Sequence, residues 1–124
     1  MANVLLWADN PEIREVLGKK GHKLFNFTDK ESALECIRSQ KLELALVEVD
    51  RPAGLEVMQE LRQLSPDLRL LMITGAPDLS CLRQAIRLGV QEILFTPLDP
   101  AELESKVAKV AKATKRNLKE ALAL

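Results

Sequence analysis

Three carboxylates stand at the ends of apolar runs, where they could bind a cation. Asp9 follows the run that ends at Trp7, and Glu48 and Asp50 flank the last residue of Leu44-Ala-Leu-Val-Glu-Val49. Short runs rich in valine and leucine predict strands buried on both faces of a parallel sheet. The carboxyl ends of such strands form the edge at which open α/β sheets bind ligands. Asp9 and Glu48 are therefore the first candidates for a site.

The sequence contains no second set of residues suited to chemistry. It has one histidine and two cysteines, Cys36 and Cys81, both inside predicted helices, so neither a zinc site nor a disulfide framework is expected. A Ser/His/Asp or Cys/His hydrolase site is not predicted either. The first predicted strand leads into Asp9-Asn-Pro11, not a glycine-rich phosphate loop. We therefore predict no catalytic residues, and a flavodoxin-like binder of small ligands is only an alternative.

Size and charge describe one ordinary domain. The 124 residues carry 18 Lys and Arg against 18 Asp and Glu, which gives no electrostatic case for nucleic acid or an anionic membrane as a partner. No apolar stretch approaches the roughly 20 residues of a membrane span, and the N-terminus lacks a signal peptide's basic region. We expect a single cytoplasmic domain over residues 1–124.

Five apolar runs alternate with five helical patterns along the chain. The predicted strands are 4–7, 24–27, 44–49, 68–73 and 93–95. The predicted helices are 10–20, 29–40, one from 55 that ends before Pro66, 78–88 and 100–122. Thr28 and Glu31 form a capping-box pattern at the second helix. This alternation predicts a flavodoxin-like α/β fold, a three-layer (βα)5 sandwich with a parallel sheet in the order 2-1-3-4-5.

Five motifs follow one another at defined spacing along the chain. They are Val4-Leu-Leu-Trp-Ala-Asp-Asn-Pro-Glu-Ile-Arg14, Gly54-Leu-Glu-Val-Met58, Leu71-Met-Ile-Thr-Gly-Ala76, Ala85-Ile-Arg-Leu-Gly89 and Leu94-Phe-Thr-Pro-Leu-Asp-Pro-Ala-Glu-Leu103. In this order and spacing they resemble the receiver domain of bacterial two-component response regulators, the CheY-like family. The resemblance extends from residue 4 to about 112. It implies that the residue four before the loop proline, Pro52, is the phosphoryl-accepting aspartate. That residue is Glu48 in this chain.

The resemblance also implies functions that this sequence only partly keeps. Receivers place two adjacent acidic residues after the first strand to hold Mg²⁺, and the matching residues here are Ala8 and Asp9. The switch hydroxyl is kept as Thr74. The lysine that neutralises phosphate charge matches Thr96, and the aromatic switch residue matches Ile93.

These substitutions favour a pseudo-receiver, a protein-interaction module that does not depend on phosphorylation. Weak Mg²⁺ binding by Asp9, Glu48 and the Asp50 carbonyl is predicted at most, and no cofactor is required. Glu48 is either a decayed site or a fixed negative charge that holds Thr74 in an active-like position. The alternative is a working receiver phosphorylated at Glu48, or at Asp50 if the register slips by two residues.

The expected partners are signalling proteins: a histidine kinase, an output domain, an effector or a second copy of the chain. The resemblance implies that receivers signal through the fourth helix, fifth strand and fifth helix, where Arg83, Arg87, Glu102 and Lys106 offer charges of both signs. From about residue 113 two alternatives are open: the last helix extends beyond the globular domain as a signalling or dimerisation helix, or it is a frayed end.

Overall fold

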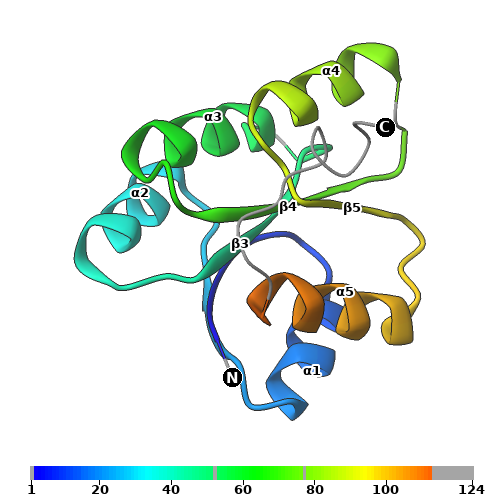
Figure 1. The fold of residues 1–124 in the computed structure, drawn as a ribbon. Coiled ribbons are helices and arrows are strands. Elements are labelled where there is room, and N and C mark those ends of the chain that lie inside the picture. The colour runs from blue at the N-terminus through cyan, green and yellow to red at the C-terminus, as the bar shows by residue number, and fades with distance from the viewer. Residues whose placement is uncertain (1, 52, 77, 113–124) are drawn as a thin grey trace.

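The computed structural model describes residues 2–51, 53–76 and 78–112, which form five strands and five helices (Figure 1). The strands are β1 Asn3–Trp7, β2 Lys23–Asn26, β3 Leu44–Glu48, β4 Arg69–Thr74 and β5 Glu92–Phe95. The helices are α1 Pro11–Lys19, α2 Lys30–Ser39, α3 Gly54–Leu64, α4 Leu79–Arg87 and α5 Pro100–Lys112. The predicted extension of the last helix from about residue 113 lies outside the described residues.

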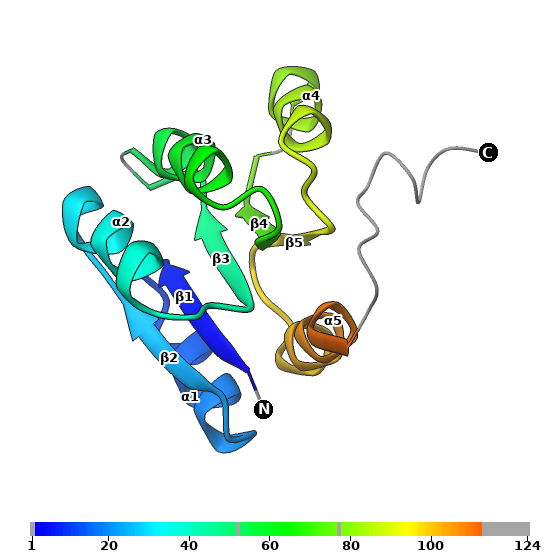
Figure 2. The same ribbon diagram turned by 60° about the vertical axis from the view of Figure 1, so that its left-hand side comes forward.

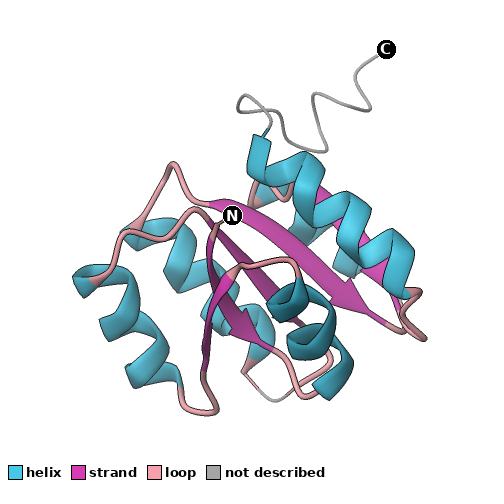
Figure 3. Cartoon of the chain, turned by 90° about the horizontal axis from the view of Figure 1, so that it is seen from below, coloured by secondary structure: helices cyan, strands magenta, loops and turns pink. Residues whose placement is uncertain are grey.

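The strands form one parallel sheet in the order β2-β1-β3-β4-β5, which confirms the predicted topology. Helices α2, α3 and α4 cover one face of the sheet, and α1 and α5 cover the other (Figure 2). The strands run side by side between these two helical layers (Figure 3). The fold is therefore the three-layer, flavodoxin-like sandwich that the alternation of apolar runs predicts.

Strand alternation divides the core into two layers. Leu70 and Met72 face α2, α3 and α4, whereas Leu71 and Ile73 face α1 and α5. Successive side chains of a strand point to opposite faces of a sheet, so one β4 sequence serves both cores. This alternation also decides where polar residues at the ends of the strands point.

Aspartate and asparagine side chains begin several helices. Asn10 accepts a hydrogen bond from the Glu12 amide at the start of α1, and Asp78 accepts one from the Cys81 amide at the start of α4. The predicted capping box at Thr28 is wrong by one residue. Asp29 is the N-cap of α2, because its carboxylate accepts hydrogen bonds from two backbone amides and from the Ser32 hydroxyl.

Candidate functional site

A tight turn after β3 builds the centre of the site. The Arg51 amide donates to the Glu48 carbonyl at 3.2 Å, and the Gly54 amide donates to the Arg51 carbonyl at 3.0 Å. Ala53 has a left-handed backbone with φ 64°. A Cβ atom on Gly54 would lie only 2.5 Å from the Glu48 carbonyl oxygen, so only glycine allows α3 to start this close to β3. Asp50 lies within this turn, and its carboxylate contacts the end of β4.

The Asp50 carboxylate bridges this turn to the end of β4. Its Oδ1 accepts a hydrogen bond from the Thr74 hydroxyl at 2.9 Å, and its Oδ2 accepts one from the Gly75 amide at 2.7 Å. Thr74 is 1% exposed, and its Oγ1 also accepts a hydrogen bond from the Ala76 amide at 3.2 Å. The Thr74 hydroxyl therefore already has both a donor and an acceptor partner within the chain.

Glu48 points away from this bridge. Its Oε1 accepts a hydrogen bond from the Asp9 amide at 3.0 Å, across the β1–β3 pair. Glu48 continues the alternation of Leu44 and Leu46 toward α1 and α5, whereas Thr74 continues that of Met72 toward the other face. The hydroxyl that Glu48 was expected to hold is thus held by Asp50.

Arg51 supplies the positive charge nearest in sequence to these carboxylates. Its guanidinium lies 4.9 Å from the centre of the Trp7 ring, a cation–π distance, and its Nη1 donates to the Phe27 carbonyl at 3.4 Å. Asp50 therefore connects this turn to the end of β4, and Arg51 connects it to the end of β2. Neither contact could be predicted from the sequence, because no periodicity fixes side-chain direction in a turn.

The remaining predicted site residues do not take part in the Asp50 bridge. Ala8 is buried between β1 and the α1–α5 core. Ile93 is buried in the opposite core. The Thr96 amide donates to the Thr74 carbonyl, and a Cβ atom on Gly75 would lie 2.5 Å from Thr96 Oγ1. Thr96 thus packs directly against the backbone of the residue after Thr74.

The donor set fits Mg²⁺ poorly. Among residues 2–51, 53–76 and 78–112, no three His, Cys, Asp or Glu side chains gather in a way that could hold a metal ion. The Glu48 carboxylate bonds to the Asp9 amide, and the Asp50 carboxylate bonds to Thr74 and Gly75. Mg²⁺ prefers an octahedral shell of oxygens at short distance, whereas the Glu48 and Asp50 carboxylates bond to different partners within the chain. The weak Mg²⁺ site therefore stays a prediction.

A hollow of about 250 Å³ separates the Asp50 bridge from α4. Asp50 and Thr74 line it on one side, and Ser80, Cys81 and Gln84 of α4 line it on the other. Burial raises the pKa of the Cys81 thiol, so the thiol is held in its neutral form. Asp50 and α4 therefore face each other across this hollow.

The four residues of the predicted interaction face are not equivalent. Lys106 pairs with Glu102 at 3.4 Å and with Glu92 at 3.5 Å, and it donates to the Ile93 carbonyl at 3.0 Å. Arg83 and Arg87 are exposed on α4, and within the described part of the chain neither forms an ion pair. Glu102 and Lys106 of α5 thus pair with each other, whereas Arg83 and Arg87 of α4 form no ion pair with any other described residue.

The sequence that carries this site and the fold that positions it are both similar to those of known proteins. Residues 4–108 match the family described as the response regulator receiver domain. The chain belongs to this family. The match covers β1 to the middle of α5, so the receiver includes all the site residues described above.

Relatives and solved structures agree with this assignment. The receiver is 31% identical over 114 residues to the transcriptional regulatory protein AruR of Pseudomonas aeruginosa, covering 83% of this chain and 46% of that protein. It is 28% identical over 113 residues to the probable transcriptional regulator ycf27 of Porphyridium aerugineum, covering 86% and 47%. This chain therefore spans about half the length of the transcriptional regulators that it matches.

The fold is also similar to solved receivers. A CheY-like receiver domain protein from Methanospirillum hungatei superposes with a TM-score of 0.81 at 20% identity, over 90% of this chain and 94% of that one. CheY4 of Vibrio cholerae superposes with a TM-score of 0.80 at 20% identity, over 89% and 98%. In the described residues, no helix is long and apolar enough to cross a membrane.

Proposed function

We propose that this receiver acts in two-component signalling as a cytoplasmic protein-interaction module that needs no phosphoryl group. The observation that carries the proposal is the Asp50 carboxylate, which accepts hydrogen bonds from the Thr74 hydroxyl and the Gly75 amide. The family resemblance implies that a phosphoryl group draws this hydroxyl inward. Here the chain's own carboxylate provides the negative acceptor, and the module catalyses no reaction of its own.

The substitutions around Glu48 weaken the chemistry of phosphoryl transfer. Transfer depends on exact positioning and on cations that offset the charge of the phosphoryl oxygens. Thr96 replaces the lysine that the resemblance implies, and Ala8 replaces one of the two acidic metal ligands. The extra methylene of a glutamate moves its carboxylate by about an ångström, enough to disturb in-line attack.

The same contacts favour a single state of the domain. A ligand shifts a conformational equilibrium only through its differential affinity for the two states. Because the Thr74 hydroxyl already donates to Asp50 and accepts from Ala76, a new group on Glu48 would have to displace a charged acceptor. Such a group would also add negative charge to an edge that carries Asp9, Glu48 and Asp50. Thr74 therefore keeps its position without a phosphoryl donor.

The proposed partners are an output domain or an effector protein, not a kinase acting as phosphoryl donor. The matched transcriptional regulators are about twice as long as this chain, which is consistent with a receiver joined to an output region. Mg²⁺ has no structural role in this proposal.

Intact-mass spectrometry after incubation with acetyl phosphate and Mg²⁺ tests the proposal. We expect no stable phosphate adduct on the wild-type chain. An adduct that disappears in Glu48→Gln would refute the pseudo-receiver and support the working receiver. An adduct that disappears only in Asp50→Asn would instead make Asp50 the acceptor and would also refute the proposal.

A further inference from the structure

The hollow between the Asp50 bridge and α4 carries negative charge without a cation to match it. Asp50 lines the hollow from the turn after β3, and Asp78 lines it from the start of α4. None of the described residues that line it is a lysine, an arginine or a histidine. A concave surface lined by charges of one sign attracts ligands of the opposite sign. The occupant suited to this hollow is therefore a cation.

The two carboxylates can accept more hydrogen bonds than the chain gives them. Asp78 Oδ1 accepts one from the Cys81 amide at 2.7 Å, and the two Asp50 oxygens accept one each from Thr74 and Gly75. An ionised carboxylate can accept about four. Burial is the main cause of the raised pKa of the Cys81 thiol, and the charges of Asp78 and Asp50 raise that pKa further. Both carboxylates thus act on one atom at the wall of the hollow.

Helix α4 and the start of α3 add polar and apolar groups to this wall. Ser80 and Gln84 lie one turn apart on α4, so both face the hollow, and their side chains form no hydrogen bond with any other described residue. Val49 and Leu55 supply an apolar surface. Ligand sites commonly combine an apolar wall with a few polar groups that fix the ligand's orientation.

The size of the hollow limits the occupant. Its volume of about 250 Å³ lies below the roughly 300–1,000 Å³ of pockets for drug-sized ligands. A divalent metal fits the lining poorly, because no three His, Cys, Asp or Glu side chains of the described chain could hold one together. A primary ammonium group has three N–H donors for these oxygens, and a short aliphatic stem would cover the apolar wall.

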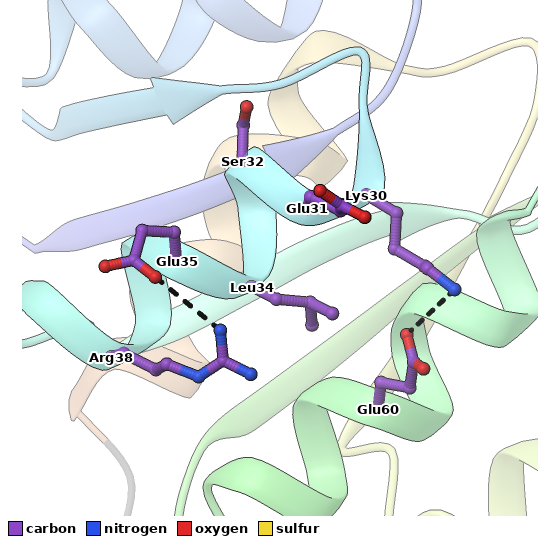
Figure 4. A pocket seen from close by; sticks show the side chains of 7 residues that line it. All are labelled: Lys30, Glu31, Ser32, Leu34, Glu35, Arg38 and Glu60. Carbon is purple, nitrogen blue, oxygen red and sulfur yellow. Dashed lines mark ion pairs between the residues drawn. The ribbon is translucent and has the colours of Figure 1, made fainter.

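Another acidic surface already contains its own cations. The groove between α2 and α3, about 610 Å³, is lined by seven residues that include Lys30, Arg38 and Glu60 (Figure 4). Lys30 pairs with Glu60 at 3.4 Å, and Arg38 pairs with Glu35 at 3.6 Å. In this groove the ammonium group of a lysine binds the carboxylates. The hollow beside α4 offers carboxylates without such a lysine.

We propose that the hollow between Asp50 and α4 binds a small aliphatic ammonium compound. Its ammonium group donates to the carboxylates of Asp50 and Asp78 and to the side-chain oxygen of Gln84, and its stem covers Val49 and Leu55. The bound ligand connects the turn after β3 to the start of α4. This assignment goes beyond the proposed interaction function, because it gives the domain a small-molecule ligand.

Two-dimensional ¹H–¹⁵N NMR with butylammonium chloride tests this inference. Sodium butyrate and sodium chloride at equal ionic strength serve as controls for charge sign and for salt, and butanol serves as the control for apolar contact. We expect butylammonium to shift the amide signals of Ser80, Cys81 and Gln84 with saturation in the millimolar range. The three controls should leave these signals in place. Equal shifts with sodium chloride or butanol, or no saturable shift at low salt, would overturn the proposal.

Variants of α4 test which groups bind the ligand. Asp78→Asn keeps an oxygen acceptor for the Cys81 amide and removes the charge, so the helix keeps its N-cap while binding should weaken by about tenfold. Asp99→Asn is the matched control, because Asp99 accepts a hydrogen bond from the Ala101 amide at the start of α5. It should bind like the wild type, and equal losses in the two variants would refute the site.

Gln84→Lys places an ammonium group of the chain in the hollow, as Lys30 does between α2 and α3, and should abolish butylammonium binding. Gln84→Met, of similar length and without charge, should still bind. Unchanged binding by Gln84→Lys would contradict the proposal. Binding of a blocked lysine peptide in place of butylammonium would also overturn it, in favour of a side chain of a partner protein. No phosphodonor is present, so failure here leaves the mass-spectrometric result independent.

Discussion

Replacing Asp50 by alanine should destabilise the domain by about 2 kcal/mol. The Thr74 hydroxyl is buried, and removing its charged acceptor leaves a donor unsatisfied, which costs about 1–3 kcal/mol. The Gly75 amide is exposed, so water replaces its lost acceptor at little cost. Asp50 itself is exposed, and solvent screening places the sum near the middle of that range.

Urea unfolding followed by the fluorescence of Trp7 measures this loss. Trp7 is the single tryptophan and is buried, so its emission reports the folded core. In a thermal melt, a loss of about 2 kcal/mol corresponds to a fall of about 8 °C in the melting temperature of a domain of this size. A double-mutant cycle with Thr74→Val should return a coupling energy of about 1 kcal/mol or more.

Asp9→Ala is the matched control, because it removes an exposed carboxylate from the same edge of the sheet. It should change stability by less than about 0.5 kcal/mol. If Asp50→Ala is equally silent and its coupling to Thr74→Val is zero, the Asp50 bridge has no energetic role. The proposal that Asp50 holds Thr74 and Gly75 in place would then be wrong.

Other changes should have equally definite results. Glu48→Gln keeps an acceptor for the Asp9 amide and should change the melting temperature by at most about 2 °C, with or without Mg²⁺. A large fall in the melting temperature of this variant, together with strong stabilisation of the wild type by Mg²⁺, would indicate a working metal site. Arg62 donates to five carbonyl oxygens in the segments that follow α3 and α4. Arg62→Met should therefore lower the free energy of unfolding by about 2 kcal/mol, and Arg62→Lys should recover less than half of that loss. Full recovery by lysine would show that charge alone matters. Burial lowers the pKa of His22, whose Nδ1 accepts a hydrogen bond from the Ala2 amide. The contribution of His22 to stability is therefore full above pH about 6.5 and is lost as the pH falls through the lowered pKa. His22→Gln should flatten this part of the pH profile of unfolding, and an unchanged profile would contradict the prediction.

The sequence predicts the fold well because its signals are physical and local. The buried run at Leu44 becomes β3, and Pro100 begins α5. Element ends are less certain, as Asp29 shows, because Thr28 and Asp29 can both accept amide hydrogen bonds and only the chain path decides between them.

The site is predicted only in part. Strand order brings Asp9 and Glu48 together, as expected from parallel pairing of β1 and β3. The partner of Thr74 could not be foreseen, because it depends on the turn that a left-handed Ala53 and a close-packed Gly54 impose. Nor does any sequence pattern indicate that His22 is partly buried and accepts a hydrogen bond from the Ala2 amide.

The central claim is that Asp50 already holds Thr74 and Gly75 in place, so that a phosphodonor does not change the structure at these residues. Two-dimensional ¹H–¹⁵N NMR of the wild-type chain, recorded with and without acetyl phosphate and Mg²⁺, tests it most directly. The account predicts unchanged amide signals for Gly75, Ala76 and α4, and large shifts of the same signals in Asp50→Ala. Shifts of those amides in the wild type on adding the phosphodonor would contradict the account.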